Sequence, residues 1–249
     1  MKIKKKQFSI ILPCFNSEKT IKRTLESIES QTYQNFNIIA VDDGSNDQTQ
    51  QILHDFKERV GKINVVEHLT NMGEAEARNT ALKIADGQFI AFIDADDCWT
   101  EDKLSTFYDH FKKGFDLLYS NYLLISAVNK REIRVPEVVS FEKLLRGNAI
   151  PLSSAAYDQT RLEKVFFKRL PKSEDYCMWL EMMKKVRNPY GIQKILMHYY
   201  IGQSNTSKNK LKMLYANWII FRIELKLGFF KSIYLIINYI LYGIRKHYL

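Results

Sequence analysis

Residues 89–99, Phe-Ile-Ala-Phe-Ile-Asp-Ala-Asp-Asp-Cys-Trp, join a strand signal to a concentration of negative charge. The five apolar residues that open the stretch do not alternate with polar ones, which is typical of a strand buried on both faces of a sheet. Three carboxylates follow within four positions, and charges at the end of a buried strand need a cationic partner. The hard oxygen atoms of Asp94 and Asp96 suit Mg²⁺ or Mn²⁺. The stretch therefore predicts a divalent-metal site, with an acidic turn that caps a helix from about residue 100 as the alternative.

Strand and helix signals alternate along the first part of the chain. Strands are predicted over 8–12, 36–41, 63–67 and 89–93, and helices over 18–31, 47–57, 71–85 and 101–113. This order predicts an α/β fold with a mostly parallel central sheet covered by helices on both faces. Ligands of such sheets bind beyond the carboxyl ends of the strands. Because the polar motifs at 13–16, 42–45 and 94–97 all follow predicted strands, we expect them to share one site.

The second half of the chain is less regular. Strands are predicted over 117–125, 154–157 and 192–200, and helices over 141–146, 159–165 and 175–185. We expect one α/β domain over residues 1–210. Residues 211–249 have a different composition and form a separate tail.

Composition narrows the partners and the compartment. The 249 residues carry a formal net charge of +9, which favours an anionic partner such as a phosphorylated small molecule or an anionic membrane. Aromatic and basic residues are not interleaved on one predicted surface, so we expect no nucleic acid partner. Cys14, Cys98 and Cys177 lie far apart and form neither a disulfide framework nor a zinc pattern. Together with an N-terminus that lacks an apolar signal core, this predicts a cytoplasmic protein.

The tail is rich in Ile, Leu, Tyr and Phe and is punctuated by Lys and Arg. Its longest uncharged run, residues 232–244, has 13 residues, which is shorter than the roughly 20 that a membrane-spanning helix needs. One interpretation is a pair of amphipathic helices that lie on an anionic membrane surface, making the protein peripheral on the inner face of the cell membrane. The other is a pair packed on its own domain or at a homodimer contact.

Five short motifs occur in order along the chain. They read PCFN at 13–16, VDDGS at 41–45, NMGEAEARN at 71–79, DADD at 94–97 and SEDYCMWL at 173–180. Each is weak alone, but the set in this order resembles glycosyltransferase family 2 over roughly residues 7–207. Members of that family have the GT-A fold, which binds nucleotide sugars. The resemblance implies the same fold here over residues 1–210, with a nucleotide-binding half at about 7–100 and an acceptor half at about 101–210. The composition of the tail predicts C-terminal amphipathic helices after this domain.

The resemblance implies a set of donor-binding residues. They are Pro13, Phe15, Asn16, Asp42, Arg78, Asp94, Ala95 and Asp96. Phe15 would offer an aromatic face to a base, and Asp42 would accept the N3–H of uracil. Arg78 would meet a base carbonyl or a phosphate, unless it forms only a surface pair with Glu74.

Asp94 and Asp96 match the D-x-D motif of the family. By resemblance, Asp94 would contact ribose or metal-bound water, and Asp96 would bind the Mn²⁺ or Mg²⁺ that bridges the diphosphate. Asp97 is extra to this motif and is interpreted either as part of the site or as a cap for the next helix.

Asp175 matches the catalytic base of the family. In direct displacement with inversion, such a carboxylate removes the proton of the acceptor hydroxyl. Glu174, Trp179 and Trp99 are interpreted as acceptor-side residues. The alternative is that Glu174 and Asp175 merely decorate a helix N-terminus, where anions are favoured.

The chain departs from the family near its last strand. Many relatives have arginine where Tyr200 stands, next to a segment that closes over the diphosphate. Lys208 or Lys210, within the loop 202–210, is the candidate replacement for that contact.

The expected function is an inverting glycosyltransferase that moves a sugar from a UDP-sugar to a glycan or lipid-linked acceptor in surface polysaccharide or lipopolysaccharide synthesis. Two alternatives remain. A sugar-phosphate nucleotidyltransferase would need a glycine-rich loop with arginine and lysine after the first strand, and nothing similar follows Leu12. A non-catalytic membrane-associated binding module would not require the carboxylates at positions 42, 94, 96 and 175.

Overall fold

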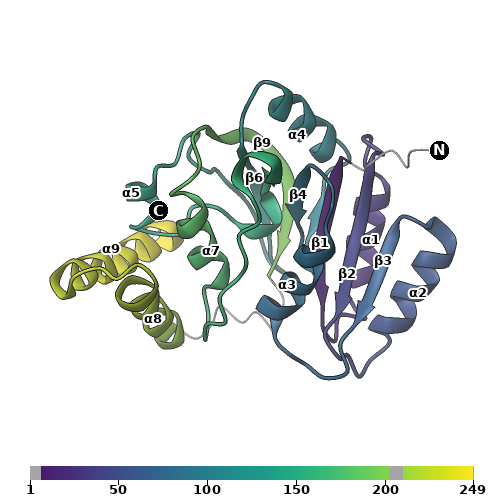
Figure 1. The fold of residues 1–249 in the computed structure, drawn as a ribbon, viewed down its shortest axis with the longest axis horizontal. Helices are drawn as coiled ribbons and strands as arrows, with labels where there is room; N and C mark the ends of the chain where they lie inside the picture. The colour runs from purple at the N-terminus through teal and green to yellow at the C-terminus, as the bar shows by residue number, and fades with distance from the viewer. Residues whose placement is uncertain (1–6, 202–209, 249) are drawn as a thin grey trace.

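The computed structural model describes residues 7–201 and 210–248. Its strands are β1 (Phe8–Cys14), β2 (Phe36–Asp42), β3 (Ile63–Glu67), β4 (Phe89–Phe92), β5 (Cys98–Trp99), β6 (Leu117–Ile125), β7 (Lys130–Ile133), β8 (Ala156–Asp158) and β9 (Pro189–Tyr200). Within the described residues they form one sheet in the order β3-β2-β1-β4-β8-β6-β9-β5, with β7 beside β6 (Figure 1). The longest ladders, β1–β2 and β6–β9, are parallel, so the predicted mostly parallel α/β sheet is confirmed.

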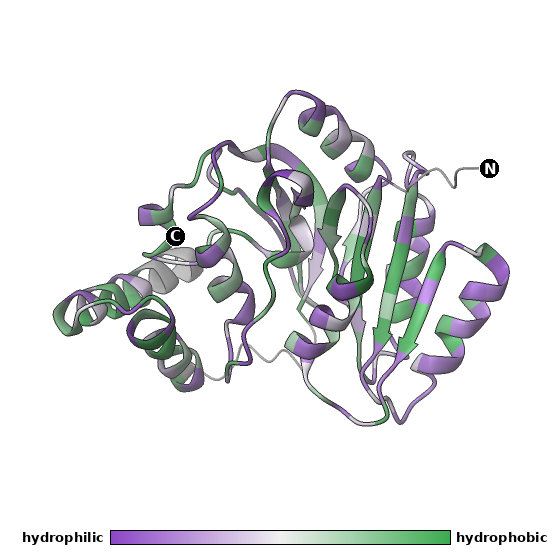
Figure 2. Cartoon of the chain, viewed as in Figure 1, coloured by the Kyte–Doolittle hydropathy of each residue, from purple (hydrophilic) through white to green (hydrophobic). Residues whose placement is uncertain are grey.

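The helices before the tail cover both faces of this sheet. They are α1 (Ile21–Glu29), α2 (Thr49–Val60), α3 (Glu74–Ile84), α4 (Lys103–Lys112), α5 (Phe141–Leu144), α6 (Gln159–Leu162) and α7 (Glu174–Met182), with the 3₁₀ helix η1 at Leu152–Ser154. α3 packs in front of β1 and β2, whereas α1 lies behind them (Figure 1). Between these helices every residue of β1 is buried, and Figure 2 shows the apolar character of β1 and β2.

Short antiparallel pairings join the two halves of the sheet. β8 pairs with β4 on one side and with β6 on the other, both antiparallel. β5 and β7, which the sequence did not predict, pair antiparallel with β9 and β6. β5 has two residues and β7 is mostly exposed and charged, so neither carries a run of apolar residues that would predict a strand.

The C-terminal helices pack onto the acceptor half. α8 (Lys210–Ile219) leads through a π-helical turn, η3 (Ile220–Glu224), into α9 (Phe229–Tyr248). Ile220, Phe221 and Leu235 are buried in the core, and the ring of Tyr176 in α7 contacts those of Phe221 and Tyr239. The tail therefore shares its core with the helix that begins at Glu174. No helix in the described ranges combines the length and the apolar content that crossing a bilayer requires.

Candidate active site

The polar motifs of the first half lie at the carboxyl edge of the parallel strands. Cys14 pairs with Asp42 where β1 and β2 end. Ile11 pairs with Phe92 at the end of β4, and the N–H of Ile93 donates to the carbonyl of Ile11 at 3.1 Å. The turn that contains Asp94 and Asp96 therefore leaves β4 beside the end of β1. This is the edge at which parallel sheets bind ligands.

Asp42 and Asp43 have different roles, although both are almost completely buried (3% and 2% exposed). The Asp43 carboxylate accepts hydrogen bonds from the backbone N–H groups of Met72 (2.9 Å) and Gly73 (2.8 Å). It therefore shapes the loop that leads into α3. Among the described residues, the Asp42 carboxylate bonds only to Ser45, which leaves acceptor capacity for a ligand.

The loops that follow β1 and β2 brace each other. The N–H of Asn16 donates to Ser45 Oγ, and the N–H of Asn46 donates to Asn16 Oδ1, each at 2.9 Å. Gly44 has φ +74°, and a Cβ there would lie 2.8 Å from the carbonyl carbon of Thr70. Only glycine allows this close approach between the loops after β2 and β3. The Asn16 side chain supports this arrangement, and its own φ of 47° is in the left-handed region.

Arg78 is the central cation of the site. Its side chain is 6% exposed, and Nη2 donates to Asp94 Oδ1 at 2.7 Å and to Glu74 Oε2 at 3.3 Å. Burial opposes its charge, but the carboxylates of Asp94, Glu74 and Asp175 outweigh burial and raise its pKa. Arg78 is thus not merely a surface partner of Glu74, because its closer ion pair is with Asp94.

The remaining carboxylates of the turn are forced close to one another. Burial and the negative charge of Asp94 raise the pKa of the Asp96 carboxyl to about 6. Asp97 is 1% exposed, and burial with the charges of Asp94 and Asp96 raises its pKa well above the ordinary value. Asp97 does not cap the next helix, since α4 begins at Lys103 and its N-cap residue is Asp102.

The turn fits a divalent cation that a ligand helps to hold. No three His, Cys, Asp or Glu side chains gather into a complete metal cage in residues 7–201 and 210–248. Asp94 and Asp96 supply two neighbouring carboxylates, and the Asp94 side chain is 33% exposed. A divalent ion would relieve their mutual repulsion, and phosphate and water oxygens would complete the shell that Mg²⁺ or Mn²⁺ requires. The residues therefore fit the metal that the motif predicts.

Asp175 lies in the first turn of α7, within electrostatic range of Arg78 and Asp94. The amide of Asn148 donates to Asp175 Oδ2 at 2.8 Å. Burial raises the pKa of the Asp175 carboxyl, while Arg78 and Asn148 act in the opposite direction. Burial likewise raises the pKa of Glu174, which also interacts with the charge of Arg78. Ser173, just before the helix, has φ 63°, a conformation that is uncommon outside glycine and recurs at functional sites.

The other predicted residues differ in how open they are. Phe15 is 42% exposed, so its ring is free to stack on a base, whereas Pro13 and Ala95 are buried. Trp99 is 3% exposed, and its indole N–H donates to the carbonyl of Ser153 at 2.8 Å. Trp179 is fully buried and packs edge-on against Phe92 of β4. Both tryptophans thus support the site from the core, and Trp179 presents no surface to an acceptor.

Three parts of the site were not found from the sequence. Ser153 accepts a hydrogen bond from the N–H of Asp94 at 3.0 Å, and Asn148 orients Asp175. Arg23 of α1 donates to the carbonyl of Asp96 at 2.8 Å. None of the three lies in a motif, so only the fold reveals them. The predicted contacts of Lys208 and Lys210 fall in the segment 202–210, whose side chains are outside the described residues.

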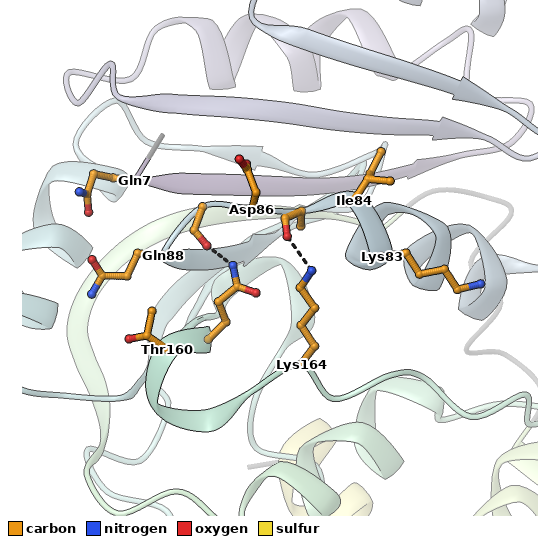
Figure 3. Close-up of a pocket in the computed structure, with 10 residues that line it drawn as sticks. Gln7, Lys83, Ile84, Asp86, Gln88, Thr160 and Lys164 are labelled. Atoms are coloured by element: carbon orange, nitrogen blue, oxygen red, sulfur yellow. Dashed lines mark hydrogen bonds between the residues drawn. The ribbon is translucent and has the colours of Figure 1, made fainter. Parts of the chain in front are cut away.

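A separate hollow lies at the opposite end of the strands. It is lined by residues at the start of β1 and β4 and by the neighbouring helices, among them Gln7, Lys83, Asp86, Gln88 and Thr160 (Figure 3). None of the predicted site residues lines it. Because ligands of parallel sheets bind at the carboxyl ends, this hollow is not the candidate active site.

The sheet order and the carboxylate-lined edge define the GT-A fold of nucleotide-sugar transferases. The structure superimposes on that of S. aureus TarS (residues 1–349) in complex with UDP-GlcNAc, with a TM-score of 0.76 at 21% identity. The match covers 96% of this chain and 73% of that one. At this identity the likeness establishes the fold alone.

The family follows from the sequence comparisons. The family model described as glycosyl transferase family 2 matches residues 9–173. Escherichia coli WfgD, a UDP-Glc:alpha-D-GlcNAc-diphosphoundecaprenol beta-1,3-glucosyltransferase, is 35% identical over 246 residues, which cover 96% of this chain and 94% of WfgD. Escherichia coli WfaP, with the same named activity, is 34% identical over 210 residues, which cover 83% of this chain and 82% of WfaP. The chain belongs to glycosyl transferase family 2 and is a glycosyltransferase.

Proposed function

We propose that the protein transfers a sugar from a UDP-sugar to a lipid-linked or glycan acceptor in the synthesis of a surface polysaccharide or lipopolysaccharide. The observation that carries this proposal is that two carboxylates act on Arg78. Arg78 donates a hydrogen bond to Asp94 at 2.7 Å, and the charge of Asp175 contributes to the raised pKa of Arg78. Asp94, a residue proposed to bind the sugar donor, and Asp175, the proposed base, therefore lie near the same guanidinium. The UDP-Glc donor and the diphosphoundecaprenol-linked acceptor named for WfgD fit this arrangement.

The geometry supports displacement with inversion. Asp175 would accept the proton of the acceptor hydroxyl as that oxygen attacks the anomeric carbon. Asn148 donates to one oxygen of this carboxylate, Oδ2, and so orients it. A divalent ion bound by Asp94 and Asp96 would stabilise the charge of the departing diphosphate. The beta linkage named for WfgD and WfaP is the outcome expected when an α-linked nucleotide sugar is inverted.

A screen of nucleotide sugars tests the proposal directly. Purified protein is incubated with Mn²⁺, a GlcNAc-diphosphate-lipid acceptor and, in turn, UDP-glucose, UDP-N-acetylglucosamine, UDP-galactose and GDP-mannose. We expect metal-dependent release of UDP from one of the UDP-sugars. Pyrophosphate production from UTP and a sugar phosphate would instead identify a nucleotidyltransferase. No UDP release with any donor would contradict the proposal.

The Asp42→Asn variant tests the base-reading role. Asp42 would accept the N3–H of uracil, a proton that cytosine lacks. The asparagine amide can also donate to the unprotonated N3 of cytosine, so the variant should bind UDP about tenfold or more weakly and lose much of its preference for UDP over CDP. Isothermal titration calorimetry with UDP and with CDP, each in the presence of Mn²⁺, measures both effects.

Asp55→Asn provides the matched control for this prediction. Asp55 is an exposed residue of α2, outside the site, and its replacement should leave both affinities unchanged. If Asp42→Asn kept the full preference for UDP while remaining folded, Asp42 would not be the residue that reads the base.

We also propose that the C-terminal helices hold the protein on the inner face of the cell membrane. The exposed stripe of α9 consists of large apolar side chains with helical spacing, namely Phe229, Phe230, Ile233, Tyr234, Ile237, Ile240 and Leu241. Exposed Lys226 and Lys231 border the stripe, as expected for contact with anionic headgroups. The opposite face of α9 is occupied, because Ser232 and Leu235 are buried against the domain. A membrane therefore fits the stripe better than a second copy of the chain, whose equally basic surface would be repelled.

The double variant Phe230→Glu/Ile237→Glu tests this surface. Phe230 is 84% and Ile237 52% exposed, so the changes do not disturb the core. Losing two inserted apolar side chains should weaken binding to phosphatidylglycerol vesicles at least about a hundredfold. Co-sedimentation with vesicles measures the loss.

Val128→Glu is the control for this surface. Val128 is 94% exposed, between β6 and β7, so its replacement should not affect vesicle binding. Unchanged vesicle binding by the double variant would contradict the membrane assignment. Light scattering that showed a wild-type dimer and a monomeric double variant would identify the stripe as a homodimer contact instead.

A further inference from the structure

Two side chains of α1 bind the backbone of the turn that contains Asp94, Ala95 and Asp96 (the D-A-D turn). Thr24 Oγ1 lies 3.0 Å from the carbonyl oxygen of Ala95 and 2.8 Å from that of Asp97. Arg23 Nη2 donates to the carbonyl of Asp96 at 2.8 Å. Two side chains of one helix thus lie within hydrogen-bond distance of three consecutive carbonyl groups, two of which share the single hydroxyl proton of Thr24. These contacts fix the backbone of the turn on the side that faces α1. They therefore fix the position of the Asp96 Cα, from which its carboxylate extends.

Arg23 also contacts the end of β9. Its guanidinium carbon lies 3.5 Å from the centroid of the Tyr200 ring, a close cation–π stack. The Arg23 Nε is buried and has no hydrogen-bond partner among the described residues. One planar guanidinium therefore connects the turn after β4 with the last residue of β9. A lysine at this position would lack the flat surface that the stack requires.

The choice of partner by Arg23 is informative. The Asp96 carboxylate lies within electrostatic range of Arg23, yet no ion pair of Arg23 with a carboxylate occurs in the described residues. The guanidinium instead binds a peptide carbonyl and an aromatic ring. Its contacts thus leave the carboxylate of Asp96 free for another cation.

We infer that Arg23, clamped between Tyr200 and the Asp96 carbonyl, is a positioning residue that sets the D-A-D turn for metal binding. The inference rests on the proposed function, in which Asp94 and Asp96 bind the divalent ion. It gives Tyr200 a role, as the ring that keeps the guanidinium in place. Residues that orient metal ligands in this way typically contribute 10- to 100-fold to metal affinity or activity.

The test compares Arg23→Met with Lys22→Met. Lys22 is the exposed neighbour on the same helix and serves as the matched control. Mn²⁺ binding in the presence of UDP is measured by electron paramagnetic resonance, together with the Mn²⁺ concentration for half-maximal transfer and the thermal unfolding midpoint. Arg23→Met should raise both Mn²⁺ constants about 10- to 100-fold, with kcat at saturating Mn²⁺ largely kept. Lys22→Met should change neither constant, and Arg23→Lys should recover part of the loss.

Variants of Tyr200 provide a second, independent measurement. Tyr200→Leu removes the ring and should weaken Mn²⁺ binding, as Arg23→Met does. Tyr200→Phe keeps the ring and should bind Mn²⁺ as the wild type does. If Arg23→Met fails to fold, this pair decides the matter alone.

Two results separate the inference from the function on which it rests. A lower unfolding midpoint with unchanged Mn²⁺ constants in Arg23→Met, or equal constants in Tyr200→Leu and Tyr200→Phe, would show that Arg23 is only a structural residue. Unchanged Mn²⁺ binding in Asp96→Asn would instead overturn the proposed metal site itself.

Discussion

The Asp96→Asn variant should transfer sugar at least about a thousandfold more slowly than the wild type. A divalent ion contributes several kcal/mol to a transition state in which a diphosphate departs, and each 1.36 kcal/mol is worth a factor of ten. Asp96 lies beside Asp94, and that charge with burial raises the pKa of its carboxyl to about 6. Asparagine has nearly the same shape but removes the charge that attracts the ion. UDP release at saturating donor and acceptor, followed across Mn²⁺ concentrations, measures the effect.

Asp86→Asn is the control for this change. Asp86 is exposed in the hollow at the amino ends of the strands, so its replacement should leave the rate and the metal requirement unaltered (Figure 3). Removing the Asp96 charge also relieves repulsion within the turn, so the variant should be at least as stable to heat as the wild type. Near-normal transfer by Asp96→Asn would contradict the proposed role of the D-A-D turn.

The Asp175→Asn variant should lose transfer while it retains donor binding. General base catalysis contributes a factor of about 10² to 10⁴, so we expect roughly a thousandfold lower kcat. The asparagine carbonyl can still accept the hydrogen bond that Asn148 donates at 2.8 Å, so the local structure should persist. Calorimetry with UDP and Mn²⁺ should give a dissociation constant close to that of the wild type, and single-turnover kinetics should show the loss.

Two neighbouring variants on α7 sharpen this prediction. Glu181 is exposed on the same helix, so Glu181→Gln should have no effect on transfer. Glu174 is the competing candidate for the base, and burial raises the pKa of its carboxyl too. If Glu174→Gln abolished transfer and Asp175→Asn did not, the base would be Glu174.

The parts of the site that could be predicted are those encoded by neighbouring residues. The apolar run at 89–93 predicted a buried strand, and the carboxylates that follow it lie at the end of β4. Asp42 and Arg78 lie in short motifs that follow a strand or open a helix. These residues were identified because local sequence determines both the element and the position of the side chain within it.

The supporting residues could not be predicted, because their contacts join segments that are distant in the chain. Ser153 binds the backbone of Asp94 from 59 positions away, and Arg23 binds that of Asp96 across 73 positions. Serine and arginine are common surface residues, and nothing in their neighbours distinguishes them. β8 spans Ala156–Asp158 and so begins two residues later than the predicted strand at 154–157. Ser154 belongs instead to the 3₁₀ helix Leu152–Ser154, which packs against the distant strands β4, β6 and β9.

The packing of α9 against α7 has a consequence for biosynthesis. Proteins are made from the N-terminus, so Leu235 and Tyr239 leave the ribosome after the other core residues described here. Until Leu235 and Tyr239 dock, Tyr176 and Phe221 lack the apolar side chains that cover them. A nascent chain therefore exposes this hydrophobic surface to chaperones. Completion of the helix that carries Asp175 is thereby coupled to arrival of the segment that we propose touches lipid, so an unfinished chain would be neither anchored nor catalytically mature.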